Sequence, residues 1–495
     1  MPDSPTPAAS SRPAPAAAQR AFAERAFLRA AGADPIDGNA VRVLLDAQEN
    51  FPAWEQAIDA ARRLILFEMY IFEDDPVGRA FAERLAARAR AGVQVFVLCD
   101  WLGSWRSGAL WRTLRAAGAQ VRLFNPLRFA SPFGWLSRDH RKTIVVDGSV
   151  GFVSGLCVSA KWWGNPARRL EPWRDTGVEI RGPAVAALES AFAQAWEACG
   201  GTPLAPSPPQ DMARQGDIRL RVVAGAPSAT GTFRLDLSIA SLARQHLWLT
   251  DAYFVGSAPY VQALAAAARD GVDVRLLVPG ASDIPALSPL SRAGYRPLLE
   301  AGVRVFEWNG TMLHAKTAVA DGVWSRIGST NLNIASWMQN YELDVAIEDA
   351  GIGAWMAGQY ERDLERSTEI VLTHHNRVRR SGRRNPLPVR RAHSGSAGRA
   401  AAGAVSVGSA LGAALANRRV LVPTEAGLIA RLGVAAIALG GIGVVWPAVV
   451  AWPVAVLSVW FGLAWLTKAA ALRRQRRAEQ GEQAQALPRR DSAAP

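Results

Sequence analysis

HAKTAVADGVWSRIGSTN, residues 314–331, is the stretch from which the fold and the chemistry of this chain are best predicted. It places Lys316 two residues after His314, Asp321 five residues later, and a Gly-Ser-x-Asn turn at its end. If the histidine and the lysine lie on one strand, their side chains share a face about 7 Å apart and can both reach one phosphate group. The turn offers backbone N–H groups to an anion. A lone histidine in such a setting is usually structural, but here the pattern occurs twice.

The earlier copy of the pattern begins at His140 and keeps Lys142 and Asp147 at the same spacing. Two matches in one chain are improbable by chance, so a purely structural role for these two histidines is disfavoured. The first copy departs from the second after the aspartate, where it reads Ser154-Gly155-Leu156-Cys157. Cys157 replaces the asparagine, and we expect a polar contact in that half to be lost.

These motifs, HxKxxxxD followed by GSxN, resemble the signature of the phospholipase D superfamily, in which two copies make one active site. The flanking residues Arg138-Asp139-His140-Arg141-Lys142 and Met312-Leu313-His314-Ala315-Lys316 look most like the bacterial cardiolipin synthase branch. The resemblance covers roughly residues 38–370 and is more specific for the superfamily than for the branch.

The resemblance implies two-step phosphoryl transfer, in which one imidazole attacks the phosphorus and the other protonates the departing oxygen. In the superfamily the nucleophile is usually in the first copy, which implies His140 as nucleophile and His314 as acid and base, although the residues themselves do not decide this. The lysines would neutralise charge on the phosphate. No metal and no cofactor is expected. The predicted catalytic residues are His140, Lys142, Asp147, His314, Lys316 and Asp321, and the predicted substrate-binding residues are Ser154, Gly155, Gly328, Ser329 and Asn331.

A nucleophilic imidazole needs its second nitrogen held by a carboxylate or a carbonyl group. Asp175 and Glu342 are candidates, because each follows one motif at a position where family members carry an acidic or polar partner. The alternative for each is a surface ion pair.

The chain repeats itself around the two motifs. Leu64–Phe72 matches Leu247–Val255, so that Glu68 and Tyr70 of the first copy correspond to Asp251 and Tyr253 of the second. Helical segments alternate with continuous apolar strands, a pattern typical of sheets covered by helices on both faces. The predicted fold is α/β, with two tandem phospholipase D-like domains packed about a pseudo-two-fold axis, so that both HxK strands converge on one phosphorus.

Composition separates the body from the C-terminal part. From residue 377 onward there are 18 Lys/Arg and 4 Asp/Glu, a net charge of +14, whereas the whole chain carries +13. The catalytic region is therefore close to neutral, which disfavours a nucleic-acid groove. The cysteines Cys99, Cys157 and Cys199 form no paired framework, which suggests a reducing, cytosolic environment.

The segment Leu432–Thr467 contains no charged residue over 36 positions, too many for one ordinary span and suited to two short ones. Trp446 and Trp452 are placed like interface anchors, and both flanks are basic, so both ends are expected in the cytoplasm. A single tilted span is the alternative. The predicted regions are a disordered N-terminal tail with a short helix (1–37) and no signal peptide, the first domain (38–201), a linker (202–215), the second domain (216–376), a basic linker (377–417), a membrane hairpin (418–477) and a disordered tail (478–495).

The sequence thus predicts a membrane-attached phosphatidyltransferase, with its catalytic domains on the cytoplasmic side of a bacterial inner membrane. Resemblance to cardiolipin synthases implies transfer of a phosphatidyl group between two phosphatidylglycerol molecules with release of glycerol, and phosphatidylethanolamine is an alternative donor. The other hypotheses are a hydrolytic phospholipase D, a nucleic-acid phosphodiesterase and an inactive lipid-binding scaffold. The expected partners are anionic phospholipids and a membrane, without nucleic acid; the sequence leaves the oligomeric state open.

Overall fold

The computed structural model describes residues 31–126, 137–165, 171–208, 213–284, 291–292, 294–372 and 378–380, and scattered positions between 434 and 466. Residues 36–380 of this described part belong to one compact unit, apart from positions 125–126 and 137. The unit is built from two successive α/β halves.

The first half contains seven strands and five helices in the described residues. Its parallel core strands are mostly apolar, as expected for strands buried on both faces; β2, LILFEM, is apolar except for the buried Glu68. The elements are β1 (Ile36–Leu45), α2 (Asp46–Ala60), β2 (Leu64–Met69), α3 (Pro76–Arg90), β3 (Gln94–Asp100), α4 (Gly108–Ala116), β4 (Gln120–Phe124), β5 (Lys142–Val146), β6 (Val150–Ser154), α5 (Ala160–Trp163), β7 (Thr176–Arg181) and α6 (Val185–Ala198).

The second half repeats this order and adds two strands at its end. The elements are β8 (Ile218–Gly225), α7 (Gly231–Leu242), β9 (His246–Thr250), α8 (Ala258–Arg269), β10 (Asp273–Pro279), α10 (Tyr295–Glu300), β11 (Arg304–Trp308), β12 (Thr317–Ala320), β13 (Trp324–Gly328), α11 (Ile334–Met338), β14 (Glu342–Glu348), α12 (Ala350–Glu365), β15 (Ser367–Leu372) and β16 (Val378–Arg380).

All these strands join in one sheet. Its order is β16-β15-β11-β10-β9-β12-β13-β14-β8-β1-β7-β6-β5-β2-β3-β4. Read outward from the central pair, the order β1-β7-β6-β5-β2-β3-β4 is matched by β8-β14-β13-β12-β9-β10-β11. The central strands β1 and β8 pair antiparallel, with Ile36 opposite Leu220. The strand order therefore has the two-fold character that the sequence repeat predicts.

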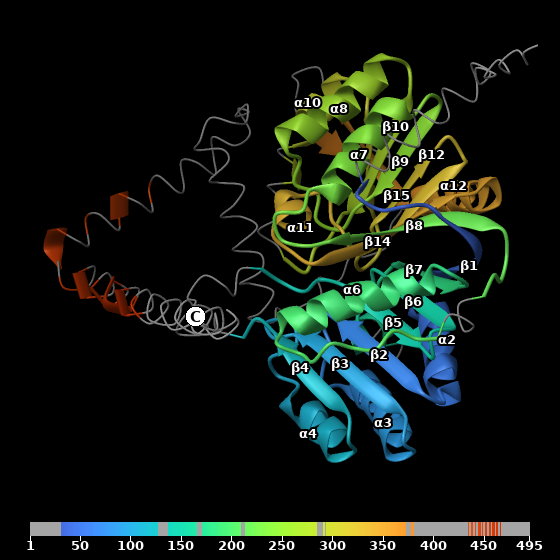
Figure 1. Cartoon of the computed structure of the whole chain (residues 1–495). Helices are drawn as coiled ribbons and strands as arrows, with labels where there is room; N and C mark the ends of the chain where they lie inside the picture. The colour runs from blue at the N-terminus through green and yellow to red at the C-terminus, as the bar shows by residue number, and fades with distance from the viewer. Residues whose placement is uncertain are drawn as a thin grey trace, which may run out of the picture. The chain divides into compact units, whose positions relative to one another are not determined.

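Three hydrophobic cores organise the layers. The first lies between the sheet of the first half and α2, α3 and α4, and another lies between the sheet of the second half and α7, α8 and α10. Between them is a central core that contains residues of both halves, together with Phe192 of α6 and Tyr360 of α12. Figure 1 shows α3 and α4 on the outer side of the first half and α7, α8 and α10 on the outer side of the second. The central core holds the two halves together behind the site.

The two HxK segments differ from the predicted strands in one respect. β5 begins at Lys142 and β12 begins at Thr317, so His140 and His314 both precede their strands. The expectation that each histidine and its lysine share a strand face is therefore wrong. The reason is that the histidine segments pair with the other half of the chain instead of continuing their own sheet.

The predicted membrane hairpin, residues 418–477, lies almost wholly outside the described residues. The positions that are described between 434 and 466 are mostly helical, and their apolar side chains are exposed. Among the described residues, no helix combines the length and the apolarity needed to cross a membrane. Residues 127–136 and 373–377 also lie outside the described residues.

Candidate active site

His140 is held by a carboxylate from the other half of the chain. Its Nδ1 lies 2.9 Å from Oε2 of Glu342, the first residue of β14. Ser329 donates its hydroxyl to the same oxygen at 2.5 Å, and Nδ2 of Asn340 lies 3.3 Å from Oε1. Because Nδ1 is engaged, Nε2 is the nitrogen left for chemistry.

His314 has the same arrangement with the halves exchanged. Its Nδ1 lies 2.8 Å from Oδ2 of Asp175, which belongs to the first half. The indole Nε1 of Trp162 donates to that oxygen at 2.8 Å, and the backbone N–H of Thr176 donates to Oδ1 at 2.9 Å. Both predicted orienting carboxylates therefore contact a motif histidine, and neither is a surface ion pair.

Backbone pairing between the halves produces this exchange. The N–H of His140 donates to the carbonyl of Tyr341 at 2.9 Å, and the N–H of His314 donates to the carbonyl of Arg174 at 2.7 Å. Tyr341 immediately precedes Glu342, and Arg174 immediately precedes Asp175. Each histidine segment thus runs beside the carboxylate segment of the other half, so neither half alone contains a complete histidine–carboxylate pair.

Both motif lysines are buried next to their histidines. Each ammonium group donates to the backbone carbonyl of the histidine two residues earlier, and Nζ of Lys316 also lies 3.2 Å from Nε2 of His314. Nζ of Lys142 lies 5.2 Å from the ring centroid of Tyr70, and Nζ of Lys316 lies 5.8 Å from that of Tyr253. The lysines therefore place positive charge beside the imidazoles, where a phosphate group would bind.

Aromatic rings surround the two imidazoles unequally. The ring centroid of Tyr70 lies 4.9 Å from that of His140, edge-on, and the ring centroid of Tyr253 lies 5.7 Å from that of His314. The ring of His314 also packs against Trp162 and Trp173, with centroid distances of 5.2 and 5.7 Å. The sequence repeat aligns Tyr70 with Tyr253 and was the available signal for these two residues. Nothing in the sequence indicated the indole bond from Trp162.

Burial is the main influence on both imidazoles. It lowers the pKa of His314 to about 4, with the charge of Lys316 acting in the same direction against Asp175. Burial also lowers the pKa of His140, against the opposing effect of Glu342. Each histidine is further influenced by the lysine of the other half, Lys316 on His140 and Lys142 on His314. The imidazoles thus share one electrostatic environment and are neutral at pH 7 in the unliganded protein.

The orienting carboxylates respond in the opposite way to their neighbours. Burial by itself raises the pKa of Asp175 and of Glu342. The positive charge that the partner histidine carries at acid pH and its hydrogen bond outweigh this effect, and Lys316 beside Asp175 and Lys142 beside Glu342 act in the same direction. The net pKa of each carboxyl group is lowered, and both are ionised at neutral pH. An ionised carboxylate accepts the Nδ1–H and keeps the lone pair on Nε2.

The motif aspartates lie away from this centre. Asp147 follows the far end of β5, about five strand residues from Lys142, and it accepts backbone N–H bonds of 2.8 Å from Arg62, Arg63 and Leu64. Asp321 accepts bonds of 2.8–3.0 Å from residues 244–246 in the second half. Their predicted catalytic role conflicts with this placement, since their oxygens are used to tie each turn to the neighbouring strand.

The Gly-Ser turns also differ from the prediction. The N–H of Gly155 donates to Thr176, that of Gly328 to Lys316 and that of Ser329 to Leu343, all backbone carbonyls. These donors are therefore committed within the sheet and do not face an anion. A side chain at Gly155 would place its Cβ 2.1 Å from Oδ1 of Asp175, so the glycine makes room for the orienting carboxylate.

The remaining predicted binding residues are buried. Ser154 donates its hydroxyl to the carbonyl of Leu156 at 3.3 Å. Asn331 is buried, and its Oδ1 has no hydrogen-bond partner in the described part of the chain. Cys157, at the equivalent place, is also buried, and burial raises the pKa of its thiol. We expected Cys157 to lack a polar contact that Asn331 makes in the second half. Oδ1 of Asn331 makes no such contact within the described residues.

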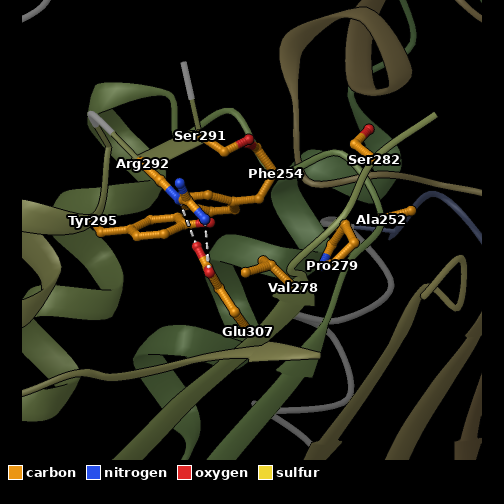
Figure 2. A pocket seen from close by; sticks show the side chains of 9 residues that line it. All are labelled: Ala252, Phe254, Val278, Pro279, Ser282, Ser291, Arg292, Tyr295 and Glu307. Atoms are coloured by element: carbon orange, nitrogen blue, oxygen red, sulfur yellow. Dashed lines mark hydrogen bonds and ion pairs between the residues drawn. The ribbon is translucent and has the colours of Figure 1, made fainter. Parts of the chain in front are cut away.

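A separate pocket lies at the ends of β9, β10 and β11 in the second half. Figure 2 shows Arg292 reaching the buried Glu307; its Nε and Nη2 bond the carboxylate at 2.7 and 2.9 Å. Phe254, Val278 and Tyr295 are among the residues that line this pocket, and neither motif histidine is among them. The pocket is therefore distinct from the histidine–carboxylate centre.

Comparisons with known proteins agree with this geometry. A family model described as the PLD-like domain of cardiolipin synthase matches residues 54–196 and 237–366. Cardiolipin synthase A of Pseudomonas aeruginosa is 34% identical over 364 residues, which cover 72% of this chain and 73% of that protein. The chain belongs to the cardiolipin synthase family of phospholipase D-like proteins. The predicted superfamily, its branch and the assignment as a phosphatidyltransferase of this type are confirmed.

Other relatives extend the likeness. Cardiolipin synthase of Geobacillus kaustophilus is 35% identical over 347 residues, covering 67% of this chain and 69% of that protein. The crystal structure of phosphatidylserine synthase from Haemophilus influenzae superposes with a TM-score of 0.55 at 14% identity, covering 70% of this chain and 91% of that chain. At that identity the superposition supports the fold and nothing finer.

Proposed function

We propose that this protein transfers a phosphatidyl group from one phosphatidylglycerol molecule to a second, forming cardiolipin and releasing glycerol. The observation that carries the proposal is the pair of buried histidines, each oriented by a carboxylate of the opposite half. The two imidazoles, each bound through Nδ1 to its carboxylate, provide the nucleophile and the acid–base group that two-step transfer at one phosphorus requires.

In the first step, Nε2 of His140 attacks the phosphorus of the donor lipid, and the bond from phosphorus to the glycerol headgroup oxygen breaks. His314 protonates that oxygen, and glycerol leaves. Binding of the anionic phosphate is expected to raise the pKa of His314 from its low value in the free protein, so that the ring carries the proton this step needs.

In the second step, His314 removes a proton from a hydroxyl group of the acceptor phosphatidylglycerol. The resulting oxygen attacks the phosphorus, and the bond to Nε2 of His140 breaks. Lys142 and Lys316 stabilise the negative charge on the phosphate oxygens in both steps. Phosphatidylethanolamine as donor requires the same bonds to form and break, with ethanolamine as the leaving group.

Hydrolysis is the second candidate function, because water can take the place of the acceptor hydroxyl group. Mass spectrometry of lipids formed from labelled phosphatidylglycerol distinguishes the two. The synthase assignment predicts cardiolipin and glycerol, with loss of both in His140→Ala. Phosphatidic acid without cardiolipin would contradict the synthase and leave the phospholipase D-type chemistry in place.

We further propose that the protein is attached to the inner membrane through residues 418–477, with the catalytic domains at 38–201 and 216–376 on the cytoplasmic side. The uncharged run from 432 to 467 and its basic flanks support this proposal. Exposed apolar side chains at described helical positions, such as Ile437 and Val444, support it as well. Basic residues near anionic lipid add roughly 1 kcal/mol of attraction each.

A further inference from the structure

Two buried carboxyl groups of the first half have no part in the mechanism above. Glu68 lies on β2 and Asp139 immediately precedes His140, and both side chains are 0% exposed. Glu68 stands opposite Thr143 in the pairing of β2 with β5. Both oxygens of Glu68 and Oδ2 of Asp139 have no hydrogen-bond partner within the described residues.

The cations nearest to these carboxyl groups are engaged elsewhere. Arg138 pairs with Asp100 at 3.2 Å, and Lys142 donates to the carbonyl of His140. The guanidinium group of Arg141 donates to the carbonyls of Glu342 and Gly225 at 3.1 and 2.8 Å. Among the described residues, neither Glu68 nor Asp139 takes part in an ion pair. If both were ionised, two like charges without an ion-pair partner would be buried together, which costs several kcal/mol.

The second half shows that this arrangement is particular to the first. The repeat places Asp251 where the first half has Glu68, and Asp251 accepts backbone N–H bonds from Leu332 at 2.8 Å and Tyr253 at 3.1 Å. The counterpart of Asp139 is Leu313, a buried apolar residue. The second half therefore has one carboxylate at this place, and it accepts two backbone hydrogen bonds. The first half has two carboxyl groups there, and the three oxygens named above accept no hydrogen bond from the described residues.

We propose that Glu68 and Asp139 share one proton, forming a buried acid–carboxylate pair that fixes the backbone at His140. The side chain of Glu68 lies within hydrogen-bonding reach of Asp139 and also of the buried hydroxyl of Thr143, which has no other partner in the described part of the chain. Two carboxyl groups can bond to each other only when one carries a proton. The bond is charge-assisted, which makes it short and strong. It ties β2 to the segment that carries His140 and leaves a single negative charge near Arg141 and Lys142.

The surrounding charges agree with a retained proton. Burial raises the pKa of Glu68 to about 7, against the charges of Arg141 and Lys142. Burial and the charge of Glu68 raise the pKa of Asp139 well above its ordinary value, and Asp100 adds to this while Arg141 opposes it. As the pH rises through the range in which the pair loses its proton, a second negative charge appears beside His140. That charge is expected to weaken binding of an anionic phosphate and to loosen the histidine segment.

Infrared spectroscopy of the full-length protein tests the pair without reference to its activity. At pH 7 we expect a C=O stretching band of a buried protonated carboxylic acid that disappears in both Glu68→Gln and Asp139→Asn. Asp251→Asn and the exposed Glu83→Gln are the controls, because burial also raises the pKa of Asp251 to about 7. Any part of the band that Asp251→Asn removes belongs to Asp251. A wild-type band whose intensity is unchanged in both Glu68→Gln and Asp139→Asn would overturn the proposal.

The activity test rests on the proposed function. Glu68→Ala is expected to lower kcat about tenfold or more with little change in KM, and Glu68→Gln is expected to restore most of that loss, since its amide donates to Asp139. Above pH 8, Glu68→Gln is expected to retain about tenfold more of its pH 7 activity than wild type. The variant gains no second negative charge at this pH, and a shift of one pKa unit corresponds to a factor of about ten. Superimposed pH profiles would contradict the proposal. Absence of cardiolipin formation in wild type would contradict the proposed function and leave the infrared result to decide the pair.

Discussion

Each motif histidine uses Nδ1 to bind a carboxylate, and this bond decides what its other nitrogen can do. The carboxylates are Glu342 for His140 and Asp175 for His314. If His140 attacks phosphorus and His314 serves the leaving group, the two carboxylates support different chemical steps. Removing the charge of either carboxylate should therefore lower kcat by an amount that depends on the leaving group of the substrate.

Asp175→Asn and Glu342→Gln provide a matched test of these roles. Both are expected to lower kcat with phosphatidylglycerol by about 10²–10⁴, the range for loss of a positioned acid–base or nucleophilic group. With phosphatidyl-p-nitrophenol the leaving group needs no proton, so Asp175→Asn should release p-nitrophenol at nearly the wild-type rate. Glu342→Gln should stay slow, because the nucleophile is still impaired.

Initial rates of p-nitrophenol release measure this difference directly. Equal rescue of both variants would show that the carboxylates do not serve separate steps. Rescue of Glu342→Gln alone would reverse the assignment of nucleophile and acid.

The low pKa values of the imidazoles predict the acid side of the pH profile. Burial lowers both below the ordinary histidine value of 6.5, and that of His314 to about 4. The midpoint of the acid limb of kcat/KM for a short-chain soluble phosphatidylglycerol should therefore lie below pH 6.5. A midpoint at or above 6.5 would mean that the imidazoles are not held neutral by burial. The same shift makes folding less favourable as the pH falls from 6.5 toward the folded-state values, because the unfolded chain then binds more protons.

At the scale of single elements, the turns after β5 and β12 explain why the motif aspartates are present. Asp147 and Asp321 both have positive φ, 53° and 52°, a conformation that Asp and Asn tolerate better than most residues. Their carboxylates accept hydrogen bonds from backbone N–H groups at the beginning of β2 and of β9 that would otherwise lack partners. We propose that both residues stabilise the fold and take no direct part in catalysis.

Asp147→Ala and Asp321→Ala are therefore expected to lower the free energy of unfolding by roughly 2–4 kcal/mol, through several lost hydrogen bonds and the strain of positive φ. The asparagine variants should lose less, since Asn keeps one acceptor oxygen and accepts this conformation. Denaturant unfolding gives the stability, and kcat per folded molecule should change less than about threefold. A loss of kcat comparable with that of His314→Ala, at unchanged stability, would restore the catalytic interpretation.

Sequence reasoning was most successful for features that depend on local pattern. The apolar runs and the repeat predicted strands such as β2 and β9, and the repeated HxK spacing predicted a paired site. The sequence indicated Asp175 and Glu342 as orienting carboxylates. It could not show which histidine each one binds, because that depends on how the two halves pack together. Motif membership also gave no information about which way Asp147 faces, and the bond from Trp162 to Asp175 arises only after folding.

At the scale of the whole molecule, the site exists only where the halves meet. β1 pairs with β8, and residues of both halves fill the central core. Residues 31–208 and 213–380, produced separately, should therefore show no transfer activity, and production together should restore it. Lipid analysis of cells that contain each half or both would measure this. Activity from either half alone would contradict a site divided between them.

The C-terminal part contributes at the same scale. Removal of residues 400–495 is expected to reduce activity on phosphatidylglycerol vesicles at least about tenfold more than activity on short-chain soluble lipid, because the basic and apolar residues that attract the bilayer are lost. The ratio of the two activities is the quantity to measure. Equal loss on both substrates would count against attachment through this region.

We propose that His140 and His314 act on one phosphorus atom, the first as nucleophile and the second as acid and base. The decisive measurement is rapid quenching of His314→Ala with phosphatidyl-p-nitrophenol, followed by peptide mass spectrometry. We expect a burst of p-nitrophenol and a phosphatidyl group on His140, with none in His140→Ala. A burst without modification of His140, or modification of a different residue, would contradict it.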